Sequence, residues 1–232
     1  MLELLILYSG LSASFSFLTF LVLRKSQNPA NIAFATTTSF YAFNTAISGV
    51  LQLHELNILP LGDPTLLSNF GMVIFLFAPL GLVYSSYMIV NGFYAWRNHT
   101  ITWFSGIYIF LGLGLSGNEM FNLMYVDFAI SDAAFNLLIC VPLFISMMLF
   151  GKLYGEMEDV SKIHFLEAGI LIGTTGQLAT TVITFFSLGD LLNYIALATI
   201  IFGVLVASVS FTNITNLIKT ARAQTSKPVP QV

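Results

Sequence analysis

Apolar segments as long as a membrane-crossing helix follow one another along nearly the whole chain. Such a helix needs about 20 predominantly apolar residues. The segments cover residues 4–23, 32–53, 66–94, a stretch that starts at Ile101, about 131–153, 164–187 and 191–218. Seven helices of this length would use roughly 140 residues, which leaves only short connections in a chain of 232. The pattern predicts an all-α polytopic membrane protein, a bundle of seven transmembrane helices without a soluble catalytic domain.

Composition supports the same class of protein. Charged residues make up 8% of the chain and hydrophobic residues 56%, whereas a soluble domain has about 25% charged residues. The net charge of -3 and the absence of a basic cluster with interleaved aromatic residues argue against a nucleic-acid partner. The single cysteine, Cys140, lies in an apolar run and excludes an internal disulfide. The amino terminus lacks the positive region of a cleavable signal, so we interpret it as a retained first span.

Basic residues lie on only one side of this expected bundle. With seven alternating spans, all of them fall in the odd-numbered connections, at their edges or in the tail: Arg24, Lys25, Arg97, Lys152, Lys162, Lys219, Arg222 and Lys227. Because cytoplasmic loops are enriched in Lys and Arg, we expect the amino terminus outside and the carboxyl terminus in the cytoplasm. The expected organisation is a seven-helix domain over residues 1–218 of a multi-pass cell-membrane protein. A short, basic, disordered cytoplasmic tail, 219–232, follows it.

Two of the segments carry a polar face. At the helical period, Glu167, Thr174, Gln177, Thr181 and Thr184 of the sixth segment fall within roughly an 80° sector. The second segment has a similar series on one side, formed by Thr37, Tyr41, Asn44, Ser48 and Gln52. The candidate site is a polar cavity lined by Thr37, Tyr41, Asn44, Ser48, Glu167, Thr174, Gln177 and Thr181. The alternative is that these side chains only form hydrogen bonds between packed helices.

Small residues and prolines add expectations about packing. Gly169, Gly173 and Gly176 lie beside the polar sector of the sixth segment and predict a close helix neighbour. Pro79 and Pro142 lie inside apolar segments, where a kink is the usual result. We also expect Ser131 to be a helix N-cap, with Asp132 in the first turn.

Several kinds of chemistry are not expected from this sequence. A covalent retinal pigment needs a lysine deep in the bundle, but every lysine lies at a span end or in the tail: Lys25, Lys152, Lys162, Lys219 and Lys227. The histidines His54, His99 and His164 fall on opposite sides of the membrane and cannot hold one metal ion. No nucleophile elbow, phosphate-binding loop or Cys-His pair is apparent. We therefore expect no cofactor, no metal and no enzymatic activity.

Three functions remain open. The first is a receptor-like sensor that signals through a membrane or cytoplasmic protein partner, using a polar cavity between the second and sixth segments. The second is an accessory subunit of a larger membrane complex, in which the Gly and Thr faces contact other subunits. The third is a small transporter or channel with a polar path near Glu167, Gln177 and Asn44.

Overall fold

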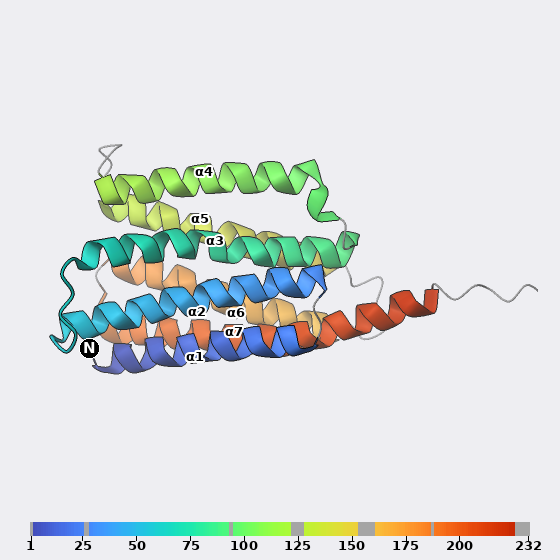
Figure 1. The fold of residues 1–232 in the computed structure, drawn as a ribbon, viewed down its shortest axis with the longest axis horizontal. Helices are drawn as coiled ribbons and strands as arrows, with labels where there is room; N and C mark the ends of the chain where they lie inside the picture. Colours follow the sequence, from blue (N-terminus) through green and yellow to red (C-terminus); the bar gives the residue numbers. More distant parts are fainter. Residues whose placement is uncertain are drawn as a thin grey trace, which may run out of the picture.

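The computed structural model describes residues 2–25, 28–92, 95–121, 128–152, 161–186 and 188–225. Within these ranges the chain forms seven α-helices, one 3-10 helix and no β-strand. The helices are α1 (Leu2–Lys25), α2 (Pro29–Glu55), α3 (Pro64–Asn91), η1 (Ala95–Arg97), α4 (His99–Phe121), α5 (Phe128–Gly151), α6 (Ser161–Phe185) and α7 (Asp190–Thr225). They lie side by side, and successive α-helices run in opposite directions (Figure 1). The predicted all-α class is confirmed.

Six of the described helices are long and apolar enough to cross a membrane, namely all except α2. The protein therefore has the architecture of a multi-pass membrane protein. Helix α2 is less apolar than the other six α-helices, and its first half carries a run of hydroxyl side chains, Thr36 to Ser39. It packs between α1 and α3, so part of this polar surface is buried in the bundle.

The two ends of the bundle differ in charge. Exposed Arg24, Arg97 and Lys152 lie at one end, where α1 and α5 finish and η1 precedes α4, and we call this the basic end. Exposed Glu55, the last residue of α2, and exposed Asp63, in the connection between α2 and α3, lie at the opposite end, which we call the acidic end. In Figure 1 the acidic end is on the left and the basic end on the right.

The starts of α2 and α3 follow from local sequence. Asn28 and Asp63 are N-caps, and the residue after each is proline. The Asn28 side chain accepts a hydrogen bond from the backbone N–H of Asn31 at 2.7 Å, and that of Asp63 accepts one from Thr65 at 2.9 Å. Proline suits the first helical position because the N–H that it lacks would have no partner inside the helix.

Two expectations about helix ends are wrong. Helix α5 already begins at Phe128, so Ser131 is not its N-cap. Instead, the buried Ser131 hydroxyl donates to the carbonyl oxygen of Leu115 in α4 at 3.3 Å, a tertiary contact that local capping rules cannot foresee. Helix α7 continues to Thr225, so the first part of the expected disordered tail is helical. This extension contains good helix formers such as Ala, Arg and Gln, and 226–232 fall outside the described ranges.

Six helices form a ring, and α4 lies outside it. Around the ring, α1 packs on α2, α2 on α3, α3 on α5, α5 on α6, α6 on α7 and α7 on α1. Helix α4 packs against α3, α5 and η1, and it forms one edge of the molecule in Figure 1. The space at the centre of the bundle is therefore bounded by six helices.

Helices α6 and α7 approach each other closely along a seam of small residues. A Cβ atom added to Gly169 would lie 2.8 Å from the Cβ of Ala207, and one added to Gly176 would lie 2.9 Å from the carbonyl oxygen of Ala196. A Cβ on Gly203 would lie 2.7 Å from the Cα of Gly173. The prediction that the glycines of this segment pack against a close neighbour is confirmed. Small residues allow such an approach of two backbones in a membrane.

Polarity is distributed as expected for a protein in lipid. Large apolar side chains project outward, among them Trp103 (72% exposed) and Phe110 (78% exposed) on α4. Polar side chains such as Thr37, Ser85 and Thr174 are buried. This surface is suited to contact with a lipid bilayer.

Candidate functional site

Two adjoining cavities occupy the centre of the helix ring. The larger one, about 380 Å³, lies toward the acidic end, and we call it the vestibule. The smaller one, about 90 Å³, lies toward the basic end, and we call it the deep chamber. All six ring helices contribute to the lining of both cavities. The two share four lining residues, Phe15, Tyr41, Gln177 and Ile200, which we call the waist.

The vestibule has a polar lining and reaches the acidic end. Its amide side chains are those of Asn44, Asn136, Gln177 and Asn193, and its hydroxyl side chains are those of Tyr8, Tyr41, Thr45, Ser48, Thr180 and Thr181. Leu4 and Asn193, which lie in the first turns of α1 and α7, are half-exposed and form part of its wall. The described lining residues include no charged side chain. The vestibule thus offers neutral hydrogen-bonding groups close to one end of the bundle.

Contacts between helices hold the waist in place. The Gln177 side-chain nitrogen donates to the Asn136 side-chain oxygen at 2.8 Å, which ties α6 to α5. The Tyr41 ring stacks on Phe15 of α1 with 5.2 Å between centroids and meets the edge of Phe75 of α3 at 5.7 Å. Aromatic pairs at such distances contribute about 0.5–1.5 kcal/mol beyond area burial. Side chains from five of the six ring helices, α1, α2, α3, α5 and α6, thus contact one another at the waist or next to it.

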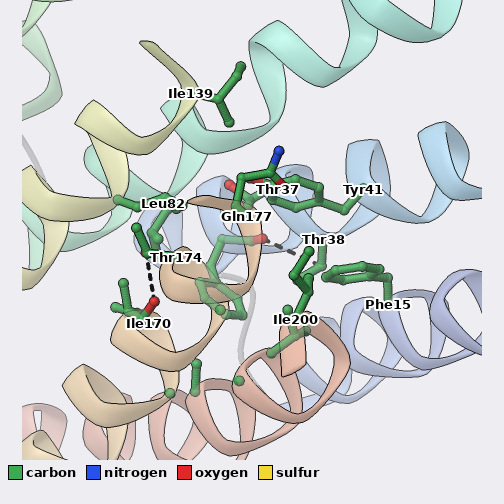
Figure 2. A pocket seen from close by; sticks show the side chains of 17 residues that line it. Phe15, Thr37, Thr38, Tyr41, Leu82, Ile139, Ile170, Thr174, Gln177 and Ile200 are labelled. Atoms are coloured by element: carbon green, nitrogen blue, oxygen red, sulfur yellow. Dashed lines mark hydrogen bonds between the residues drawn. The ribbon is translucent and has the colours of Figure 1, made fainter. Parts of the chain in front are cut away.

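The deep chamber is apolar in spite of its three threonines (Figure 2). The Thr174 hydroxyl donates to the carbonyl oxygen of Ile170 at 2.7 Å, a bond drawn in Figure 2. The Thr38 hydroxyl donates to the carbonyl oxygen of Ala35 at 3.1 Å, and that of Thr37 to Ala33 at 3.5 Å. Threonines that bond to their own helix in this way have little polarity left for a ligand.

Aromatic side chains close the cavity toward the basic end. Phe34 of α2 stacks on Phe211 of α7 with 3.8 Å between ring centroids, and Phe150 of α5 meets Phe211 edge-on at 6.5 Å. Phe150 and Phe211 are fully buried and Phe34 nearly so. These three residues, which we call the aromatic plug, belong to a larger apolar cluster that includes Val22, Leu166 and Ile163. Among the described residues, the cavity is therefore a funnel with a closed narrow end.

The structure brings seven of the eight predicted site residues to this funnel. Thr37 and Thr174 line the deep chamber, and Tyr41 and Gln177 belong to the waist. The remaining three, Asn44, Ser48 and Thr181, line the vestibule. Whether they bind a ligand or only pack the helices stays a prediction.

Glu167 is separate from the other seven residues. It lines neither of the two cavities. Its side chain is 17% exposed and lies 3.9 Å from His164, one turn earlier in α6 and near the basic end. Its carboxylate lies beside Gly151 of α5, next to Phe150 of the aromatic plug, where an added Cβ atom would be 3.4 Å from Oε1 of Glu167.

Sequence reasoning missed two amides of the vestibule. Asn136 lies in a strongly apolar segment, and an isolated polar side chain in such a segment is a signal for an inward-facing role. Asn193 lies close to the turn before α7, where a polar residue is common and carries no such signal.

Comparison of the chain with protein-family models, curated proteins and solved structures found no match.

Proposed function

We propose that this chain is a non-enzymatic seven-transmembrane-helix sensor of the cell membrane, which binds a small ligand in the funnel and signals through a partner protein. The observation that carries the proposal is the shape of the cavity, which reaches one end of the bundle and is closed at the other by the aromatic plug. A cavity of about 380 Å³ is within the range of roughly 300–1,000 Å³ typical of small-molecule sites.

Seven spans follow if α1 and α3 both cross the membrane. Helix α1 ends at the basic end and α3 begins at the acidic end, so α2 has to cross between them. Its 27 residues extend about 40 Å at 1.5 Å per residue, enough for a hydrocarbon core of about 30 Å. Exposed Thr36 on its outer face donates to the carbonyl oxygen of Ile32 at 2.9 Å, which reduces the cost of contact with lipid.

Charge gives the orientation of this topology. Arg24, Arg97 and Lys152 lie at the basic end, which is the cytoplasmic end under the positive-inside rule. The vestibule then faces the outside. The carboxyl-terminal part of α7 projects beyond the basic end (Figure 1), where a cytoplasmic partner can reach it.

Lining residues supply a physical route for the signal. Gly169 and Gly173 of α6 and Gly203 and Ala207 of α7 line the deep chamber and also form the seam between these helices. A ligand in the deep chamber therefore touches both sides of the seam. If the ligand binds one arrangement of α6 and α7 more tightly than another, it shifts the equilibrium between the two arrangements by that difference in affinity. The projecting end of α7 moves with this shift because it belongs to the same helix.

Features of the site make the other two functions less suitable. A transporter or channel needs a path to the second face, but the aromatic plug closes the deep chamber toward the basic end, and Glu167 lines neither cavity. An accessory subunit that binds its neighbours through the glycine face needs that face free, but α7 of the same chain covers it. The funnel lining contains no carboxylate, histidine, lysine or cysteine among the described residues, which supports a role without catalysis.

Thiol labelling of sealed vesicles tests whether the funnel is accessible from one side of the membrane only, as the sensor requires. In a Cys140→Ala background, we expect Asn193→Cys in the vestibule to react with a membrane-impermeant reagent from the outside only. Thr174→Cys in the deep chamber should react from neither side, because such reagents are charged or strongly polar and the chamber is small and apolar. A transporter that alternates between two open states would allow Thr174→Cys to react from both sides. Reaction of Thr174→Cys from the cytoplasmic side would therefore contradict the sensor.

A further inference from the structure

The funnel offers different chemistry at its two ends. The vestibule presents four amide side chains, and an amide can both donate and accept hydrogen bonds. The Ser and Thr hydroxyls of the vestibule donate to carbonyl oxygens of their own helices, so the amides account for the difference between the two ends. The deep chamber presents apolar side chains and threonines whose hydroxyls already bond to their own helix. We propose that the funnel binds an uncharged amphiphile with a single unbranched apolar chain. Its polar head lies in the vestibule, and its chain passes the waist into the deep chamber.

The lack of charge in the ligand follows from the lining. The described lining residues of both cavities include no Asp, Glu, Lys, Arg or His. Moving a charged group out of water costs much free energy if the site offers no group of opposite charge. A neutral polar head costs little free energy if the site replaces the hydrogen bonds that the head made with water. The amides of Asn44 and Asn193 can form hydrogen bonds with a hydroxyl or an ester.

The shape of the ligand follows from the size of the deep chamber. An apolar cavity of about 150 Å³ holds benzene, and the deep chamber has only about 90 Å³. A linear chain fits this volume better than a ring does. Along α7, the funnel runs from Asn193 to Ala207, on the order of 20 Å at 1.5 Å per residue, and it ends at the aromatic plug. The ligand therefore has a maximum chain length.

Gly173 gives a variant that shortens the funnel. It lines the deep chamber, and a Cβ atom added there would meet no heavy atom within 4 Å, so a larger side chain fills open space. Gly106 of α4 is the matched control, because a Cβ there also meets nothing within 4 Å but points away from the ring on an exposed position. The pair Gly173→Leu and Gly106→Leu thus makes the same change inside and outside the funnel.

The buried thiol of Cys140 reports unfolding without any added probe. It is the only cysteine of the chain, is 2% exposed and lines neither cavity. Thermal unfolding of the full chain in lipid nanodiscs is followed by the reaction of this thiol with a fluorogenic dye. The ligands tested are 1-alkanols of increasing chain length, with alkanoates and alkylammonium ions of matched length as charged analogues.

We expect alkanols to raise Tm of the wild-type chain by about 5–10 °C at a ligand concentration of roughly 100 times Kd. The rise in Tm should increase with the chain length of the alkanol up to an optimum and then fall. In Gly106→Leu the optimum chain length should be the same as in the wild type, and in Gly173→Leu it should be shorter. Equal stabilisation by either charged analogue, or an unchanged optimum in Gly173→Leu, would overturn the proposal.

This inference rests on the proposed function only in placing a ligand in the funnel, and the two can fail separately. If alkanols bind as described but Thr174→Cys is labelled from both faces, the ligand class stands and the sensor fails. If labelling is one-sided but the alkylammonium ions bind as well as the alkanols, the sensor stands and the ligand class fails.

Discussion

Gln177 is the side chain that joins the two parts of the funnel. It lines both cavities and donates to Asn136 of the neighbouring helix at 2.8 Å. Hydrogen bonds between membrane helices contribute only about 0.6 kcal/mol on average and up to about 1.7, because the unfolded chain in the membrane also finds partners. The bond therefore positions the amide more than it stabilises the fold.

A double-mutant cycle tests this view. We expect Gln177→Leu and Asn136→Leu each to lower the free energy of unfolding modestly, with a coupling energy of about 0.5–1.5 kcal/mol. The measurement is unfolding of the two single variants, the double variant and the wild type, followed through Cys140. A coupling energy near zero would mean that the contact does not contribute to stability. Loss of the fold in either single variant would mean that the network contributes far more than membrane hydrogen bonds usually do.

Local sequence rules fail at single residues where a tertiary partner intervenes. Ser131 has the sequence context of an N-cap, but its hydroxyl bonds to Leu115 of another helix. The polar faces of α2 and α6 could be predicted, since a helical period of 3.6 residues fixes which side chains share a side. The same period could not indicate that Glu167 lines neither cavity, because depth along the bundle depends on which side chains meet at its centre.

At the scale of helices, the seam between α6 and α7 is a close backbone contact that borders the deep chamber. Its glycines could be predicted to face a neighbour, because small residues gather where membrane helices approach closely. Which helix is that neighbour could not be predicted. The position of α4 outside the ring could not be predicted from the sequence either. In an apolar helix, the face toward lipid and the face toward other apolar helices have the same kinds of residue, so the helical period does not distinguish them.

Alanine at two glycines should change stability in opposite directions. A methyl group on Gly169 would lie 2.7 Å from the Cα of Ala207, so Gly169→Ala forces the two helices apart and should cost about 1–3 kcal/mol. Gly106→Ala places a methyl in open space and gains up to about 1 kcal/mol of helix propensity. We expect Tm to fall by about 2–12 °C in the first variant and to rise by up to about 4 °C in the second. Equal shifts in both variants would indicate that the seam is not tightly packed.

At the scale of the whole molecule, the direction of the funnel depends on the number of spans. If α2 lay on the membrane surface instead of crossing it, the connection between α2 and α3 would be on the same side as the end of α1. The alternating helix directions in Figure 1 place that connection at the acidic end, opposite Arg24. The ring of six helices also needs α2 between α1 and α3 to close the funnel on that side.

Cysteines at two exposed positions decide between these topologies. Gly62 lies in the connection between α2 and α3 at the acidic end, and exposed Pro29 begins α2 at the basic end, so the two positions are on opposite sides of the membrane only if α2 crosses it. In a Cys140→Ala background, we expect an impermeant thiol reagent added to intact cells to modify Gly62→Cys but not Pro29→Cys. In permeabilised cells both cysteines should be modified, which controls for the reactivity of each thiol. Modification of Pro29→Cys alone in intact cells would reverse the orientation, whereas failure to modify either would place α2 on the inner surface. In both cases the vestibule could not receive a ligand from outside, and the route from the funnel through α7 to a cytoplasmic partner would fail with it.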